Sequence, residues 1–472
     1  MPITEQIEGS KPEDSLGIFA RLGVGLADWS QRWFPDAFVF ALLALVIVFV
    51  GGLLAGSSVR SLIDYFGQGF WSLIPFKMQM AMVIIGGYVV ATSPPVHRLI
   101  CSLARIPSTP RGAIAFVAFI SLITSLISWG LSLIFSALLV REVVKRVRAV
   151  DYRAIGAAAY LGLGSVWALG FSSSATLLMA TPSAIPGGLL KISGAIPLRQ
   201  TIYLWQSIAM AGILICSGVL VAYLSAPPSS TKTAESFGIA ETADTEELGK
   251  QRTPGEWLEF VPVLSIVIGL IGLAYLMRVL IVRGPLAALD LNTYNLLFLM
   301  AGLLLHWRPR SFIRAVNNAV PATSGVLIQF PFYGGIFGIV TMSAISADMA
   351  RFFVHVSSQS SYPVLVSVYS AILGMFVPSG GSKWIIEAPY VLQAAKDLHV
   401  HLGWIVQVYN ASEALPNLVN PFWMLPLLGI LKVRARDLVG FGLIQLLVNS
   451  ILVVFLVWFL AQTLTYSPPF LP

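Results

Sequence analysis

The stretch Met375-Phe-Val-Pro-Ser-Gly-Gly-Ser-Lys-Trp-Ile-Ile-Glu-Ala-Pro389 decides how this chain folds. It places a helix-breaking proline, paired glycines, two serines, a lysine and a glutamate inside a sequence that is otherwise apolar. Hydrocarbon offers backbone N–H and C=O groups no water, so irregular chain at membrane depth persists only where it is buried in protein or lines a cavity. The stretch is therefore a candidate binding site within a membrane.

The composition around this stretch is that of an all-α polytopic membrane protein. Of the 472 residues, 57% are hydrophobic, and only 11% are charged, where a soluble domain carries about 25%. The mean hydropathy is +0.82. The 29 Lys and Arg residues stand singly between apolar segments rather than in one stripe, which argues against a nucleic-acid partner and favours a role in orienting spans in the bilayer.

Residues 112–140 are too long for one ordinary crossing and are interrupted at Ser128-Trp129-Gly130. Basic residues flank both ends, for example Arg111 and Arg141. A crossing would leave one basic cluster outside, whereas a segment that enters and returns on one face leaves both inside. This pattern predicts a re-entrant hairpin, and residues 363–396, which contain the opening stretch, are expected to form a second one.

An internal repeat relates the two halves of the chain. Ser61–Phe66 resembles Ser311–Val316, and Leu73–Phe76 resembles Leu327–Phe330, at a nearly constant offset of about 250 positions. One additional span between the halves makes the second half start on the opposite face, so the two repeats are expected to be inverted. Each would hold a hairpin and a broken transmembrane helix, with about nine full crossings in all.

These boundaries give a domain plan. The N-terminus is predicted to be cytoplasmic and the C-terminus outside, because most basic residues then face the cytoplasm. The expected order is an N-terminal tail and interfacial helix at 1–35, a first repeat at 36–225 with its hairpin at 112–140 and broken helix at 154–190, a cytoplasmic linker at 226–256, a connecting helix at 257–277, a second repeat at 290–461 with its hairpin at 363–396 and broken helix at 404–430, and a tail at 462–472.

The hairpin tips and helix breaks carry the candidate substrate-binding residues. A broken helix presents free amides on one side and free carbonyls on the other, so facing tips suit an anion and a cation. A serine bonding back to its own helix is the alternative for each position alone. Trp129 and Trp384 could form an apolar wall for an acyl chain, with interface anchoring as the rival. The candidates are Ser128, Trp129, Ser172, Ser173, Ser174, Thr176, Ser379, Gly380, Gly381, Ser382, Lys383, Trp384, Asn410, Asn417 and Asn420.

Lys383, Glu387 and Glu413 are candidates for a coupling-ion site or a charge pair, because ionisable residues within a membrane are costly and are usually paired or functional. Lys383 and Glu387 stand four residues apart, so they could neutralise each other on one helix. Alternatively, Lys383 meets a substrate carboxylate, or its ammonium occupies the place of a coupling cation. No metal site and no cofactor are expected.

Several motifs together resemble the bacterial short-chain fatty acid transporter family (AtoE type), within the ion-coupled carboxylate transporter superfamily. They include Pro378-Ser-Gly-Gly-Ser-Lys-Trp384, Ala301-Gly-Leu-Leu-Leu-His306, Gln329-Phe-Pro-Phe-Tyr333 and Asn420-Pro-Phe-Trp423. The resemblance implies a secondary active transporter of the bacterial cytoplasmic (inner) membrane, with alternating access and many dimeric relatives. The expected substrate is a monocarboxylate similar to acetate, butyrate or acetoacetate, moved by cation symport with Na⁺ or H⁺. A homodimer in the lipid bilayer is one expected assembly.

The chain departs from the family pattern at Ser382, Lys383 and Glu387. A transporter of another small organic anion, such as a dicarboxylate or an amino-acid derivative, is therefore an alternative. An intramembrane hydrolase with Ser379 as nucleophile and Lys383 as base is a remote alternative.

Overall fold

The computed structural model describes residues 37–227, 232–238, 253–284, 288, 290–376, 380–420 and 422–469. These residues form an all-helical structure without a strand. The predicted N-terminal interfacial helix, most of the linker, and Pro378 and Ser379 of the opening stretch lie outside the described residues.

The helices of the first half are α2 (Ala37–Leu54), α3 (Val59–Phe70), α4 (Ile74–Ala91), α5 (Pro94–Leu103), α6 (Pro110–Ile127), α7 (Trp129–Val144), α8 (Tyr152–Ser165), η2 (Trp167–Leu169), α9 (Ser174–Ala180), η3 (Pro182–Ala184), α10 (Gly187–Ser193), η4 (Leu198–Gln200) and α11 (Trp205–Ser225). Between the halves lie η5 (Ala234–Phe237), α12 (Trp257–Phe260) and α13 (Val263–Arg283). The second half comprises α14 (Leu291–His306), α15 (Pro309–Ala319), η6 (Val320–Thr323), α16 (Ser324–Met342), α17 (Ile345–Val356), α18 (Tyr362–Phe376), α19 (Gly380–Asp397), α20 (Leu402–Asn417), η7 (Phe422–Met424), α21 (Leu425–Leu431) and α22 (Ala435–Ala461).

Short polar residues and prolines set where many of these helices begin. Ser58 caps α3 by accepting from Ser61 N, and Thr109 caps α6 ahead of Pro110. Asp151 caps α8 by accepting from the backbone of Arg153 and Ala154. These side chains satisfy amides that have no partner within the helix. The apolar runs therefore start as helices at defined residues.

Six described helical segments are long and apolar enough to cross a membrane, or seven if the bent pair Pro309–Thr323 and Leu327–Met342 is one span. The six are Ile74–Ala91, Pro110–Ile127, Tyr152–Ala180, Trp205–Ser225, Val263–Arg283 and Ala435–Ala461. Three shorter apolar helices, Ala41–Leu54, Leu291–His306 and Tyr362–Met375, add to them. The chain is therefore an integral membrane protein by the length and composition of its helices.

Helices α6 and α7 fold back on each other at Ser128. Ser128 is the C-cap of α6 and the N-cap of α7, with an extended backbone at φ −155° and ψ 120°. The Ser132 hydroxyl donates to Ser121 O at 2.8 Å, and Thr124 donates to Ser132 at 3.1 Å. Residues eleven apart would be about 16 Å apart along one straight helix, so these contacts require a sharp reversal. Helices α18 and α19 also contact each other.

The first broken helix consists of α8, η2 and α9, with its irregular chain at Gly170–Ser173. In the second broken helix the break begins later than expected. Within the predicted broken helix at 404–430, the repeat offset sets the break of Gly170–Thr176 against Glu413–Pro421, but α20 is regular through Glu413 and Pro416 and ends at Asn417. Asn410 and Glu413 therefore lie on a continuous helix, with the break after them.

The connecting helix is also shifted from its predicted range of 257–277. Only the short α12 forms at Trp257–Phe260, and the long helix α13 begins at Val263 after Pro262. A proline is tolerated at the start of a helix but would remove a hydrogen bond from its interior. The long helix therefore starts after this proline and extends to Arg283.

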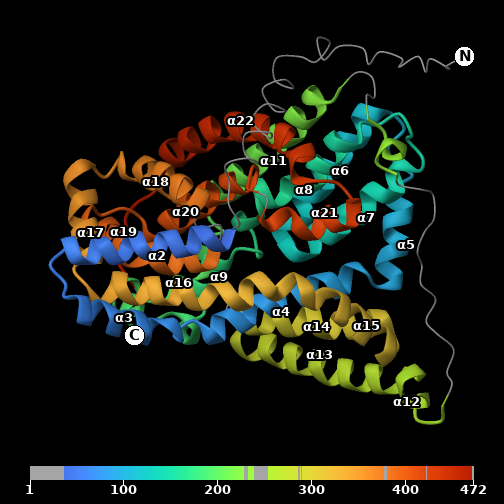
Figure 1. Cartoon of the computed structure of the whole chain (residues 1–472), viewed down its shortest axis with the longest axis horizontal. Helices are drawn as coiled ribbons and strands as arrows, with labels where there is room; N and C mark the ends of the chain where they lie inside the picture. Colours follow the sequence, from blue (N-terminus) through green and yellow to red (C-terminus); the bar gives the residue numbers. More distant parts are fainter. Residues whose placement is uncertain are drawn as a thin grey trace, which may run out of the picture.

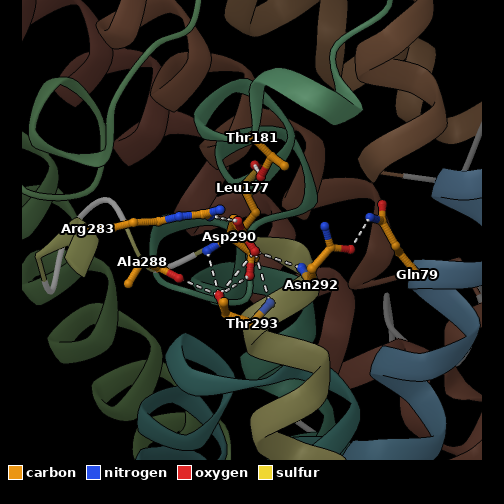
Figure 2. A network of polar contacts seen from close by, with 8 residues as sticks. All are labelled: Gln79, Leu177, Thr181, Arg283, Ala288, Asp290, Asn292 and Thr293. Carbon is orange, nitrogen blue, oxygen red and sulfur yellow. Dashed lines mark hydrogen bonds and ion pairs between the residues drawn. The ribbon is translucent and has the colours of Figure 1, made fainter. Parts of the chain in front are cut away.

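Helix α13 packs beside α14 along one edge of the molecule, as Figure 1 shows. The start of α14 is fixed by a polar network (Figure 2). Asp290 caps the helix by accepting from Thr293 N at 2.9 Å, and the Thr293 hydroxyl donates to Ala288 O. Arg283, the last residue of α13, lies 3.6 Å from Asp290. Asn292 accepts from Gln79 of α4 at 2.8 Å, so the network ties α14 to both neighbouring helices.

Glycines allow two pairs of helices to touch through their backbones. A Cβ atom added to Gly69 of α3 would lie 2.3 Å from Gly334 O of α16, and one added to Gly338 would lie 2.2 Å from Tyr65 O. Between α4 and α7, a Cβ on Gly87 would lie 2.5 Å from Leu131 N. Contacts this close between helices are typical of membrane proteins, where small residues let backbones approach.

Candidate functional site

The turn between α6 and α7, the start of α19 and both helix breaks contribute to one small internal void. Trp129 comes from that turn, and Gly380 and Gly381 are the first residues of α19. Ser174 and Asn417 adjoin the two helix breaks. The void has a volume of about 20 Å³, enough for about one water molecule. Five of the predicted substrate-binding residues, separated by up to 288 positions, are thus brought together.

Other residues of this lining were not among the sequence candidates. They are Met80, Leu163, Trp167, Phe330 and Trp423. All are apolar or aromatic and stand in apolar segments, where a core side chain and a cavity-lining side chain have the same sequence pattern. Trp423 belongs to the family motif Asn420–Trp423, which was the one available signal.

The tip of the first hairpin is bonded to the first helix break. Trp129 N donates to the Ser172 hydroxyl at 2.6 Å. Ser128 is completely buried and accepts from Leu131 N at 3.3 Å. Both serines therefore satisfy amides at the start of α7, and they position the Trp129 indole rather than line the void themselves.

The first break is also joined to α20 by buried polar side chains. The Ser173 hydroxyl donates to Asn410 Oδ1 at 3.1 Å, and Asn410 Nδ2 donates to Thr176 Oγ1 at 2.9 Å. Asn410 Nδ2 also donates to Gln407 Oε1 at 3.2 Å. Asn410 is thus a bridge between the two halves of the chain, and its amide has partners on both sides.

Lys383 and Glu387 form a buried ion pair. Both side chains are fully buried, and Lys383 Nζ lies 3.0 Å from Glu387 Oε1. Lys383 Nζ also donates to Ser370 O at 3.0 Å and stands 4.2 Å from the centre of the Tyr409 ring. The second carboxylate oxygen of Glu387 accepts from the Ser370 hydroxyl at 2.6 Å. Lys383 therefore has partners within the protein, and it is not one of the residues that line the void.

Glu413 has a different environment. Glu413 is 1% exposed, and neither of its carboxylate oxygens has a hydrogen-bond partner among the described residues. One of its oxygens lies 3.1 Å from the position that a Cβ atom on Gly380 would take, beside the first turn of α19. A buried carboxylate without hydrogen-bond partners is costly when ionised.

The remaining candidates lie apart from the void or outside the description. Trp384 is buried against Tyr409, with ring centroids 4.6 Å apart, and does not line the void. Asn420 is buried but is not part of the lining. Ser379 lies outside the described residues, and the side chain of Ser382 does so as well.

A second, much wider cavity of about 620 Å³ adjoins the void. Trp129 and Trp423 line both of them. The wide cavity lies between α4, α7, the α15–α16 junction and α21. Most of its wall is apolar, with polar groups at Asn318, Ser324 and Gln329.

An all-helical membrane protein with a small polar and aromatic site at the meeting point of interrupted helices has the architecture of a transporter. The chain belongs to the short chain fatty acid transporter family, whose family model matches residues 18–460. It is therefore a transporter and not an enzyme, which removes the hydrolase alternative.

The curated relatives agree with this family over nearly the whole chain. A protein of Escherichia coli (strain K12) named "Putative short-chain fatty acid transporter" is 34% identical over 440 residues, which cover 93% of this chain and 99% of that protein. A Haemophilus influenzae protein of the same name is 32% identical, covering 94% of this chain and all of that protein. The crystal structure of the Alcanivorax borkumensis YdaH transporter, described as having an unusual topology, matches with a TM-score of 0.55 at 16% identity over 90% of this chain and 99% of that one. This last likeness concerns the fold alone.

Proposed function

We propose that this protein carries short-chain monocarboxylates, such as acetate, butyrate or acetoacetate, across the bacterial cytoplasmic membrane by cation symport. The substrate would bind at the void between the hairpin tips and the helix breaks. The observation that carries the proposal is the meeting of Trp129, Ser174, Gly380, Gly381 and Asn417 at this one place.

The polarity of the void suits a short acid with an apolar tail. Gly380 and Gly381 are the first residues of α19, where amides have no partner within the helix and the helix dipole favours an anion. The indoles of Trp129, Trp167 and Trp423 offer an apolar wall for the tail. The substrate carboxylate would therefore lie at the start of α19, with the acyl chain against the tryptophans.

Glu413 is the proposed site of the coupling cation. Its carboxylate lies beside the same helix start, where a negative charge would repel a bound substrate anion. A proton removes that charge without further ligands, whereas a sodium ion would need several oxygen atoms around it. We therefore favour H⁺ over Na⁺ as the coupling ion.

The pattern of helix contacts supports two inverted repeats. Helix α2 packs on α16 and α14 packs on α4, while α3 packs on α16 and α15 on α4. In the same way, α7 packs on α21 in one case and α19 packs on α9 in the other. Contacts that are reproduced when the halves are exchanged are expected of two copies of one module, which would support alternating access with about nine crossings.

The basic residues support a cytoplasmic N-terminus and an external C-terminus. Under this topology the wide cavity would open toward the cytoplasm, since Asn318 and Ile430 of its wall lie close in sequence to Arg314 and Lys432. The homodimer implied by the family resemblance is proposed on that ground alone, and light scattering of the purified protein in detergent tests it.

Uptake into proteoliposomes tests the function. Labelled butyrate, acetoacetate and succinate are offered under an imposed proton gradient and, separately, a sodium gradient. We expect monocarboxylate uptake driven by the proton gradient and little succinate uptake. Glu413→Gln should abolish the response to the proton gradient, while Glu259→Gln, at an exposed ion pair with Arg310, should retain it. Failure of every monocarboxylate under both gradients would refute the proposed function.

A further inference from the structure

Trp129 and Trp423 are the two residues that the linings of the void and the wide cavity share. Their ring centroids are 5.1 Å apart, and the ring planes meet at 66°. Edge-to-face contacts at this distance are favourable and leave no gap for a solute between the rings. The pair therefore lies on the boundary that the two linings share.

Trp129 is the fixed member of this pair. It is the first residue of α7, it is only 6% exposed, and its amide is held by Ser172. Behind it, the backbones of α4 and α7 touch at Gly87 and Gly130. Moving the Trp129 backbone would therefore require the turn between α6 and α7 to shift against α4.

Trp423 is the more exposed member of the pair. It lies in the middle of η7, a single turn of 3₁₀ helix between α20 and α21, and is only half-buried. The turn η7 leads directly into α21, and 3₁₀ turns have poorer hydrogen-bond geometry than α-helices. A rotation of the Trp423 side chain, or a small rearrangement of η7, would open the wall without disturbing the first hairpin.

From this arrangement we propose that the Trp423 indole is a movable barrier that closes against Trp129, separates the substrate site from the wide cavity, and limits the length of acyl chain that the site accepts. The limit arises because the void of about 20 Å³ ends at the two indoles. Butyrate has six non-hydrogen atoms, so even a short tail displaces the barrier, and a longer tail would have to extend through it. The chain-length part of this inference rests on the proposed function, whereas the barrier itself does not.

The barrier is tested by the reactivity of an introduced thiol. Cys101 and Cys216 are first replaced by alanine, and Ser174→Cys then places a thiol at the void. Asn318→Cys, in the wall of the wide cavity, is the matched control. Purified protein in detergent is treated with a sulfonated methanethiosulfonate reagent. We expect Trp423→Ala to raise the labelling rate of Ser174→Cys at least tenfold and to change that of Asn318→Cys less than twofold.

Two results would overturn the barrier. One is labelling of Ser174→Cys as fast as Asn318→Cys while Trp423 is present, and the other is no acceleration in Trp423→Ala. If Trp423→Ala does not elute as a single species, Trp423→Leu is judged by the same two criteria. Because labelling needs no substrate, a protein that carried no monocarboxylate would still report whether the barrier exists.

The chain-length limit is measured by competition. Octanoate is titrated against labelled butyrate uptake in proteoliposomes that contain the parent protein or Trp423→Ala. We expect octanoate to compete at least fivefold better in the variant, relative to unlabelled butyrate. An unchanged ratio would refute the role of Trp423 in selecting chain length, and Trp458→Ala on the exposed face of α22 is the control.

Discussion

Breaking the buried Lys383–Glu387 pair on one side should cost far more than replacing both partners. The two charges are fully buried and 3.0 Å apart. Lys383→Met leaves the Glu387 carboxylate with the Ser370 hydroxyl as its remaining described partner, and Glu387→Gln leaves the ammonium with Ser370 O and the Tyr409 ring. Each single change should lower the free energy of unfolding by about 3–5 kcal/mol, because it strands a buried charge.

The double variant Lys383→Met, Glu387→Gln carries no charge at these two positions and keeps an amide opposite Ser370. Its free energy of unfolding should fall less than that of either single variant, since replacing both members of a buried pair is often nearly neutral. Equilibrium unfolding in SDS, followed by tryptophan fluorescence, gives the double-mutant cycle. Coupling between the two positions should be at least about 2 kcal/mol. Additive losses, agreeing within about 0.5 kcal/mol, would refute the reasoning.

An exposed pair of similar geometry provides the control. Arg310 and Glu259 are 2.9 Å apart, but their side chains are 51% and 45% exposed. The cycle of Arg310→Met and Glu259→Gln should give a coupling below about 1 kcal/mol.

The same Lys383 and Glu387 variants also separate a structural role from a binding role. The butyrate KM of the double variant should stay within threefold of the parent value, and a tenfold rise would make Lys383 a substrate ligand.

Three further outcomes follow from the geometry of the site. Gly381→Ala would put a Cβ atom 2.3 Å from Phe76 Cζ, so butyrate uptake should fall at least tenfold, whereas Gly187→Ala, with open space around it, should leave uptake unchanged. Asn410→Leu removes three buried hydrogen bonds and should cost about 2–4 kcal/mol in SDS unfolding, and a loss below about 1 kcal/mol would contradict the bridge. Ser172→Ala strands a buried backbone N–H and should cost about 1–3 kcal/mol by the same measurement, with no loss as the contrary result.

The sequence predicted the parts of the fold that depend on local chemistry. Ser128 interrupts a long apolar run with a side chain that can cap a helix, and the structure has its helix reversal there. Polar residues in an apolar chain also drew attention to Ser174, Gly380, Gly381 and Asn417, which meet at the void. A polar or helix-breaking residue is unusual in apolar surroundings, so the sequence alone marks such positions.

The other features of the site depend on how the helices are rotated against one another. Trp167 and Trp423 line the void, while Trp384 turns toward Tyr409, and nothing in an apolar run distinguishes these three orientations. The repeat offset placed a helix break from Glu413 onward, whereas α20 is regular through Glu413 and Pro416. A proline in the last turn of a helix costs only bonds that are already near the helix end, so the helix continues past Glu413.

The backbone contact of α3 with α16 has a consequence for how mutational maps of this protein should be interpreted. At Gly69, Gly334 and Gly338 even the smallest side chain would collide with main-chain atoms of the opposite helix. Saturation mutagenesis scored by growth on a fatty acid should therefore reject nearly every substitution at these three positions, as it would at a ligand site. The two kinds of intolerance are separable, because substitutions at the helix contact reduce the amount of protein in the membrane and those at the site reduce turnover per molecule.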